Sequence, residues 1–511
     1  MKYCLERKSL ELCNEELESE HEKLRKVLGP VALTSLGIGT IIGTGIFVLV
    51  GVAAHDTAGP AIVVSFIVAG IACMFAALCY AEFASMTPVA GSAYTYAYAT
   101  LGEVFAWIIG WDLILEYTVA SAAVAVGWSG YFQNFLSSTF GIHIPAALAG
   151  APFDMDPATG SLNLTGNWVD LPALLISSIL TIIIVMGIKE SAWVNSLIVI
   201  IKTTVVLFVI AIGIFYVVPS NWIPFAPFGW TGLSLFGDAI VIGGTSDSGK
   251  PLGMLAGAGI IFFAYIGFDA VSTHAEEARN PQRDVPIGIL ASLVICTFLF
   301  IGVAGVVTGI VKYDELNVKA PVADAFARTG IPYAETLISI GAIAGLTSVM
   351  MVLMLSQSRV ILAMARDGLL PRGFFGAVHP KFRTPWKTSI LTGVCVGILS
   401  GVLPLRTLFE LVNIGTLFAF VVVCLAVLIM RYKRPEFPRP FRCPWVPFVP
   451  IMGAIMCLML MLALPPENWT RLFFWLAGGM FIYVFYGRTR SILAQERAGT
   501  LVRPPATPPT S

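Results

Sequence analysis

Long apolar stretches dominate this chain, and they limit its possible folds more than any other feature. About a dozen of them reach roughly 17 residues or more, the length that an α-helix needs to cross a bilayer core. Hydrophobic residues make up 57% of the 511 residues and charged residues only 12%, whereas soluble domains carry roughly 25% charged residues. The sequence therefore predicts an all-α integral membrane protein with about 12 transmembrane helices.

The apolar stretches also define the order of the segments. We expect spans at about residues 32–52, 60–85, 100–131, 170–188, 192–218, 252–275, 287–311, 332–366, 388–404, 406–430, 446–464 and 469–487. The chain then divides into a cytosolic N-terminal segment (1–26), a ten-span core (27–431), two accessory spans (432–490) and a disordered cytosolic tail (491–511). With the N-terminus inside, about 23 Lys and Arg residues fall on the inner side and about 6 on the outer side. This asymmetry predicts a multi-pass plasma-membrane protein with both termini in the cytoplasm.

Composition and motifs exclude several classes of function. The formal net charge is zero, which gives no electrostatic case for binding nucleic acid. The nine cysteines include no CxxC pair, so we expect free thiols and neither a disulfide framework nor a metal site. No HExxH or GxSxG motif is present, so we do not expect an enzyme or a cofactor.

The first apolar segment carries a glycine-rich break. Residues 35–47 (SLGIGTIIGTGIF) contain four glycines and two threonines. Each glycine costs up to about 1 kcal/mol of helix propensity, and an opened turn exposes N–H and C=O groups that hydrocarbon cannot satisfy. Such a break is tolerable where it lines a cavity, and the N–H groups of the following half-helix favour a carboxylate. The stretch predicts a site for a small anionic or zwitterionic solute, with a GxxxG helix-packing face at Gly39 and Gly43 as the alternative.

A second glycine-interrupted segment lies in the sixth span, at residues 257–270 (GAGIIFFAYIGFDA). Interrupted segments in corresponding positions of two halves are typical of transporters that are built from inverted repeats. Spans one to five and six to ten would form these repeats. The two breaks would then face each other near the middle of the membrane.

Three of the ionisable residues within expected spans are functional candidates, because a charge there costs about 2.5 to 3.5 kcal/mol on insertion scales. Lys202 lies about 15 Å beyond the inner end of the fifth span, which places it near the bilayer midplane. We interpret it as a fixed positive charge or as part of a proton-linked switch. Glu116 and Asp269 are candidates for gating the pathway or receiving a substrate cation. For all three, the alternative is a structural role through bonds to neighbouring backbone groups.

Several stretches together resemble the amino acid–polyamine–organocation (APC) superfamily, namely residues 43–47 (GTGIF), 263–270 (FAYIGFDA) and 276–286 (EEARNPQRDVP). Residues 363–371 (AMARDGLLP) resemble the cationic amino acid transporter family within it. The resemblance extends from about residue 26 to residue 493, and the number of spans is similar to that of bacterial members. It implies a LeuT-like fold of two inverted five-span repeats with broken helices 1 and 6.

The resemblance also implies roles for matching residues. Three residues of the first span would bind the substrate carboxylate: Ile41, Thr44 and Gly45. Three residues of the sixth span would bind the α-amino group through their backbone carbonyls: Phe263, Ala264 and Ile266. Lys202 would occupy the place of a sodium ion, and Glu116 and Asp269 match acidic positions near the pathway and its gate.

We therefore expect a secondary active transporter (permease) that moves L-amino acids across the plasma membrane by alternating access, coupled to protons and independent of sodium. Its substrates would be small neutral, alanine-like amino acids, cationic ones, or both. Met350, Met351 and Met354 in the eighth span favour the neutral class. An amino acid or polyamine exchanger and a non-transporting amino acid sensor stay open as alternatives, as does a small accompanying membrane subunit.

Overall fold

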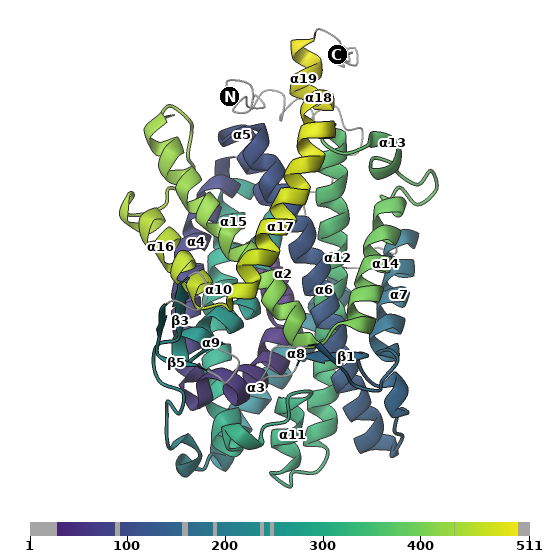
Figure 1. Cartoon of the computed structure of the whole chain (residues 1–511), viewed down its shortest axis with the longest axis vertical. Helices are drawn as coiled ribbons and strands as arrows, with labels where there is room; N and C mark the ends of the chain where they lie inside the picture. The colour runs from purple at the N-terminus through teal and green to yellow at the C-terminus, as the bar shows by residue number, and fades with distance from the viewer. Residues whose placement is uncertain are drawn as a thin grey trace.

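A computed structural model gives the architecture and describes residues 28–86, 92–155, 162–187, 192–235, 240–245, 250–433 and 435–498. Helices dominate this part of the chain and run mostly along the long axis of the molecule (Figure 1). The expected N-terminal segment (1–26) lies outside the described residues. Helix α19 (Ile492–Arg497) falls within the segment expected to be a disordered tail, and residues 499–511 are outside the described residues.

Seven helical runs of the described chain are long and apolar enough to cross a membrane. They are Gly45–Met86, Glu103–Phe140, Leu197–Tyr216, Met254–Ser272, Pro281–Ile310, Ala334–Arg366 and Leu405–Lys433. Three shorter apolar helices are α2 (Pro30–Ile41), α7 (Leu171–Met186) and α14 (Trp386–Val402), while Phe448–Leu462 and Pro466–Glu496 form a pair bent by 113°. The chain is thus a multi-pass helical membrane protein, and the count of 12 spans stays a prediction.

The remaining helices and the strands complete the element order. The longer helices are α4 (Ile62–Met86), α5 (Ser92–Thr100), α6 (Glu103–Phe140), α8 (Ala192–Gly213), α10 (Pro281–Ile310), α12 (Ala334–Arg366), α15 (Leu405–Lys433), α16 (Phe448–Leu462) and α17 (Pro466–Ile482). Short helices are α11 (Pro321–Ala327), α13 (Arg372–Phe375) and α18 (Arg488–Arg490). Three antiparallel strand pairs lie between helices: β1 (Phe153–Met155) with β2 (Leu162–Leu164), β3 (Leu233–Leu235) with β4 (Ile240–Ile242), and β5 (Gly244–Thr245) with β6 (Pro251–Leu252).

Local sequence explains where α7 begins and ends. The Asp170 side chain caps its first turn by accepting a hydrogen bond from the Ala173 N–H at 3.1 Å. Gly187 ends the helix in the left-handed conformation with φ 64°, which glycine adopts without a Cβ clash. The same ending recurs in α6, where Gly141 has φ 66°.

Both predicted breaks are present. Helix α2 ends at Ile41, the chain is extended at Ile42, and the helical path resumes in η2 (Gly45–Leu49), α3 (Val50–Ala53) and η3 (Ala54–Ala58). In the sixth expected span, α9 (Met254–Ile261) continues as η8 (Phe262–Tyr265), and η9 (Asp269–Glu277) follows after Gly267 with φ 112°. That positive φ explains why glycine occupies the second break.

The helices pack in a recurring pairing. Helix α4 packs against α10, α6 against α12, and α7 against α14. In the expected numbering these are the second and seventh, third and eighth, and fourth and ninth spans. Two repeats of five spans would give this pairing, although the repeat itself stays a prediction. Helix α15 packs against α6 and α16, so the last helices cover one side of the core (Figure 1).

Candidate functional site

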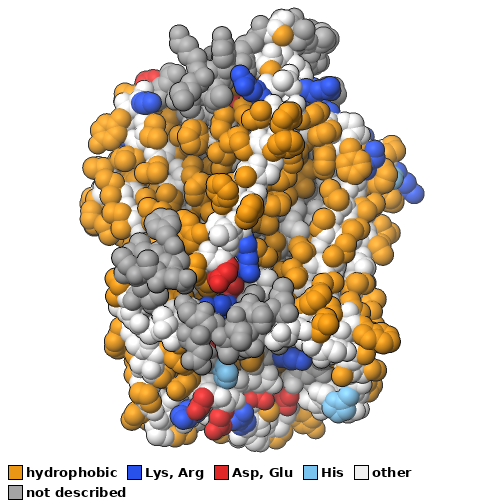
Figure 2. Space-filling model, viewed as in Figure 1, with side chains coloured by type: hydrophobic (Ala, Val, Ile, Leu, Met, Phe, Trp, Pro, Cys, Tyr) orange, Lys and Arg blue, Asp and Glu red, His pale blue; other side chains and the backbone are white. Residues whose placement is uncertain are grey.

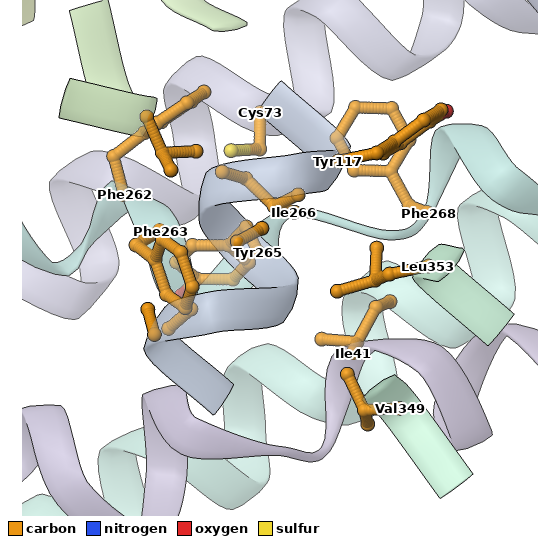
Figure 3. Close-up of a cluster of buried hydrophobic side chains, with 14 of the residues drawn as sticks. Ile41, Cys73, Tyr117, Phe262, Phe263, Tyr265, Ile266, Phe268, Val349 and Leu353 are labelled. Carbon is orange, nitrogen blue, oxygen red and sulfur yellow. The ribbon is translucent and has the colours of Figure 1, made fainter. Parts of the chain in front are cut away.

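The two breaks line one small cavity near the centre of the helices. All six residues that the family resemblance assigned to the substrate line it: Ile41, Thr44, Gly45, Phe263, Ala264 and Ile266. Figure 3 shows Ile41 on one side of this region and Phe263 and Ile266 on the other. Segments more than 200 positions apart thus meet at one cavity, while the role of each residue stays a prediction.

The two broken segments touch through their backbones. A Cβ atom on Gly45 would lie 2.3 Å from the Cβ of Ala264 and 2.4 Å from its Cα. The Thr40 hydroxyl lies 2.9 Å from the Gly37 carbonyl in its own helix and 2.9 Å from the Gly267 carbonyl across the break. Glycine at position 45 is therefore a packing requirement, because no side chain fits between the two segments.

One end of the cavity offers hydrogen-bond donors. The first N–H groups of a helix have no partner within it, and residues Gly43, Thr44 and Gly45 line the cavity where the second half-helix begins. The Thr44 hydroxyl is buried and has no hydrogen-bond partner. Together with the positive end of the helix dipole, these groups suit a carboxylate.

The opposite wall offers backbone carbonyls. Phe263 and Ala264 come just before the second break, and the chain leaves the helical conformation at Ile266. The Phe263 carbonyl already accepts the Ile266 N–H at 3.1 Å, which leaves its second lone pair. Carbonyl oxygens in this position suit the N–H groups of an ammonium ion.

Apolar side chains form the rest of the wall. Ala120 and Val124 come from α6, and Val349 and Leu353 come from α12. Within each helix the two residues are four positions apart, which places them on the same face. Met350 and Met354 are buried but do not line the cavity, so the α12 part of its wall comes from Val349 and Leu353.

Lys202 lies at the first break. Its side chain is completely buried, and its Nζ donates to the carbonyl of Gly39 and, at 3.2 Å, to that of Ile42. The Gly39 carbonyl belongs to the last turn of α2, and the Ile42 carbonyl follows directly after it, at the negative end of the helix dipole. The ammonium group thus satisfies carbonyls that the broken helix leaves without partners.

Comparison with known proteins decides the family. Residues 28–486 match the model of the amino acid permease family. The chain belongs to this family, within the APC superfamily. This confirms the resemblance that the sequence motifs predicted.

The permease has bacterial and eukaryotic relatives. It is 46% identical over 476 residues to the methylthioribose transporter of Bacillus subtilis (strain 168), covering 93% of this chain and 96% of the relative. It is also 46% identical over 478 residues to the branched-chain amino acid permease BcaP of that organism, with the same coverage. Identity to the vacuolar cationic amino acid transporter 4 of Arabidopsis thaliana is 38% over 415 residues, which cover 81% of this chain and 64% of that longer protein.

Neither of the two acidic candidates of the permease lines the cavity. Asp269 is buried and accepts the Tyr117 hydroxyl at 2.7 Å and the Gly267 N–H at 3.3 Å. Glu116 is buried one turn beyond Asp112, and its Oε1 has no hydrogen-bond partner. Asp269 thus supports the backbone of the second break, whereas Glu116 has unused hydrogen-bonding capacity.

Proposed function

We propose that this permease is a secondary active transporter that moves neutral L-amino acids across the plasma membrane by alternating access. The observation that carries the proposal is a single cavity lined by residues of both helix breaks. This arrangement matches the carboxylate and ammonium groups that all α-amino acids share. A LeuT-like fold of two inverted repeats, with both termini in the cytoplasm, provides the frame for the movement.

The apolar wall favours a neutral substrate over a cationic one. Ala120, Val124, Val349 and Leu353 present no charge, and no acidic residue is among the described residues of the lining. A lysine or arginine side chain placed here would lose its hydration without a counter-charge. The name of the similar branched-chain amino acid permease supports the same class.

Lys202 supports proton coupling without sodium. Its ammonium group bonds to the Gly39 and Ile42 carbonyls, so a positive charge already stands where a bound sodium ion would otherwise satisfy them. We assign Lys202, Glu116 and Asp269 to coupling and gating. A change in protonation near the first break would alter the bonds that hold α2 in place.

The 46% identity to a methylthioribose transporter gives a second candidate function. A methylthioether would suit the apolar wall, and ribose hydroxyls would suit the unpartnered Thr44 hydroxyl and the backbone groups. The backbone carbonyls that would otherwise accept the N–H groups of an ammonium ion would then accept hydrogen bonds from the ribose hydroxyl groups.

Uptake into proteoliposomes tests these assignments. The purified permease and its Lys202→Ala variant would be supplied with radiolabelled L-leucine, L-alanine, L-arginine or methylthioribose, with an inward proton gradient, a sodium gradient or neither. Vesicles preloaded with unlabelled amino acid distinguish exchange from net uptake. A melting curve of Lys202→Ala checks that the variant is folded.

We expect uptake of leucine or alanine that rises with the proton gradient, ignores sodium and is lost in Lys202→Ala. Uptake of arginine but not of neutral amino acids would overturn the substrate class, and preference for methylthioribose would favour the second candidate. Uptake only into preloaded vesicles would indicate an exchanger. Amino acid binding without any uptake would indicate a sensor.

A further inference from the structure

The segment between α12 and α14 (residues 368–387, here the basic loop) carries positive charge without acidic residues. It contains four basic side chains: Arg372, Lys381, Arg383 and Lys387. The chain has no Asp or Glu between Asp367 and Glu410. In the proposed orientation the loop lies at the cytoplasmic end. Figure 2 shows Lys and Arg side chains at the upper right, above an apolar surface, where Figure 1 places α13 and the start of α14.

Lys387 holds its ammonium group over aromatic rings and not against a carboxylate. Its Nζ lies 5.5 Å from the ring centroid of Phe374 and 5.6 Å from that of Trp386. Its hydrogen bond to the Gly373 carbonyl is long, at 3.5 Å, and it forms no ion pair with a described residue. Cation–π contacts orient a cation but use none of its N–H donors. The Lys387 ammonium group therefore keeps donors for an anion.

His379 fixes a turn that brings a second lysine to the same aromatic cluster. Its Nδ1 accepts the backbone N–H groups of Lys381 at 3.1 Å and of Phe382 at 3.2 Å. Because Nδ1 is the acceptor, the ring proton lies on Nε2, which is a further donor. The His379 ring lies 4.7 Å from Phe382 and 6.1 Å from Trp386 between centroids. The Lys381 Nζ lies 5.6 Å from the Phe382 centroid, so two lysines and one imidazole border one cluster of rings.

The basic loop is attached above two helices that expose apolar side chains. The Thr384 hydroxyl donates to the Val185 carbonyl at 2.8 Å, which fixes the loop to the last turn of α7. Helices α7 and α14 pack against each other. Exposed apolar residues three or four positions apart form a stripe along each helix: Ile179, Ile182 and Met186 in α7, and Leu391, Val394 and Ile398 in α14. Lys387 lies four positions before the first of these α14 residues, so it continues that stripe to the cytoplasmic end.

Charge compensation distinguishes the basic loop from the basic segment at residues 431–442. Arg431 and Arg439 of that segment both contact Glu82, at 2.7 and 3.2 Å. The positive-inside rule accounts for basic residues in both segments. It does not account for lysines that lie over aromatic rings without a carboxylate partner among the described residues. An anion from outside the chain would complete their interactions.

We propose that the basic loop binds the phosphate of an anionic phospholipid in the inner leaflet. Lys381, Lys387 and the His379 Nε2–H donate to the phosphate oxygens, and Trp386 lies at the level of the headgroups. The acyl chains lie along the exposed stripes of α7 and α14. The ammonium group of a zwitterionic phospholipid is repelled by the two lysines, so the site prefers phosphatidylglycerol to phosphatidylethanolamine. The inference does not depend on amino acid transport.

Native mass spectrometry of the detergent-solubilised full chain tests the site. Phosphatidylglycerol and phosphatidylethanolamine with the same acyl chains are titrated against the parent, the double variant Lys381→Gln/Lys387→Gln and the control Lys312→Gln. Lys312 is a matched control because its Nζ also lies near a ring, 5.9 Å from the Tyr313 centroid, but pairs with Asp314 at 2.9 Å.

We expect the parent to bind phosphatidylglycerol about 10-fold more tightly than phosphatidylethanolamine. The double variant should lose about 10-fold or more of its affinity for phosphatidylglycerol, and Lys312→Gln less than about 2-fold. Equal binding of the two lipids by the parent, or equal losses in the double variant and the control, would overturn the site. Displacement of the lipid by inorganic phosphate at equal concentration would overturn a lipid as the occupant.

Photocrosslinking of the unchanged chain provides a second test that does not depend on folding of the double variant. The parent is placed in phosphatidylcholine nanodiscs that contain phosphatidylglycerol with a photoreactive headgroup, and the labelled peptides are mapped. We expect labelling within residues 368–387 that excess unlabelled phosphatidylglycerol removes. Labelling of residues 431–442 instead would overturn the proposal.

Discussion

Gly45 lies so close to Ala264 that an added Cβ would stand 2.4 Å from the Ala264 Cα. We expect Gly45→Ala to push the two broken segments apart and to weaken substrate binding about 10-fold or more, since overpacking typically costs about 1 to 3 kcal/mol. Equilibrium binding of radiolabelled leucine to the purified protein measures the change.

Gly478→Ala is the matched control, because a Cβ at Gly478 in α17 meets no atom within 4 Å. This change should leave binding unaltered and improve helix propensity by up to about 1 kcal/mol. Equal binding by Gly45→Ala and the parent would contradict the view that the two breaks form the substrate site together.

The α12 side chains that line the central cavity should set the size of the substrate. Leu353 lines this cavity, so Leu353→Ala should enlarge it and shift preference from alanine toward bulkier apolar amino acids, by about 10-fold in relative affinity. Competition of unlabelled methionine and phenylalanine against labelled alanine measures the shift. Met354→Ala is the control, since Met354 is buried in the same helix without lining the cavity. The same shift in both variants would mean that loosening of α12, and not the cavity wall, controls preference.

The sequence was sufficient to locate both breaks and the buried lysine. The reason is that glycine clusters and charges are costly inside apolar segments, so they stand out without any knowledge of packing. Residues 35–47 and 257–270 carry this signal directly, and Lys202 is one of very few charges within a span.

The cavity wall could not be predicted in the same way. Val349 and Leu353 are apolar residues in a helix of apolar residues, and only the packing of α6 against α12 selects that face over the one with Met350 and Met354. The contact between the rings of Phe263 and Phe409 likewise joins residues that are 146 positions apart, so no local sequence pattern predicts it. The spacing of apolar residues indicates which residues share one face of a helix, whereas tertiary packing decides which face lines the cavity.

The Tyr117 hydroxyl and Asp269 should be energetically coupled. Their 2.7 Å hydrogen bond is buried and links α6 to the second break. We expect Tyr117→Phe to cost about 1.5 to 3 kcal/mol if Asp269 is ionised, and much less in the Asp269→Asn background. A double-mutant cycle on unfolding in mixed detergent measures the coupling. Tyr131→Phe, which loses a bond to the Phe47 carbonyl instead, should show no coupling to Asp269→Asn. Additive effects of Tyr117→Phe and Asp269→Asn would show that the hydrogen bond does not stabilise the break.

The buried carboxylate of Glu82, near the C-terminal end of α4, should contribute more to the stability of the protein than to its choice of substrate. Glu82 accepts bonds from Arg431 at 2.9 and 2.7 Å and from the Cys443 N–H at 2.8 Å, and Arg439 lies 3.2 Å away. Glu82→Ala would leave these guanidinium groups without their carboxylate, at a cost of about 3 kcal/mol. Unfolding of the purified protein in a detergent titration measures this loss. Glu315→Ala is the matched control, because its bond to Arg328 is exposed and should contribute about 0 to 1 kcal/mol. Glu82 links α4 to α15 and to the segment before α16. If Glu82→Ala lost no more stability than Glu315→Ala, apolar packing alone would hold these elements together.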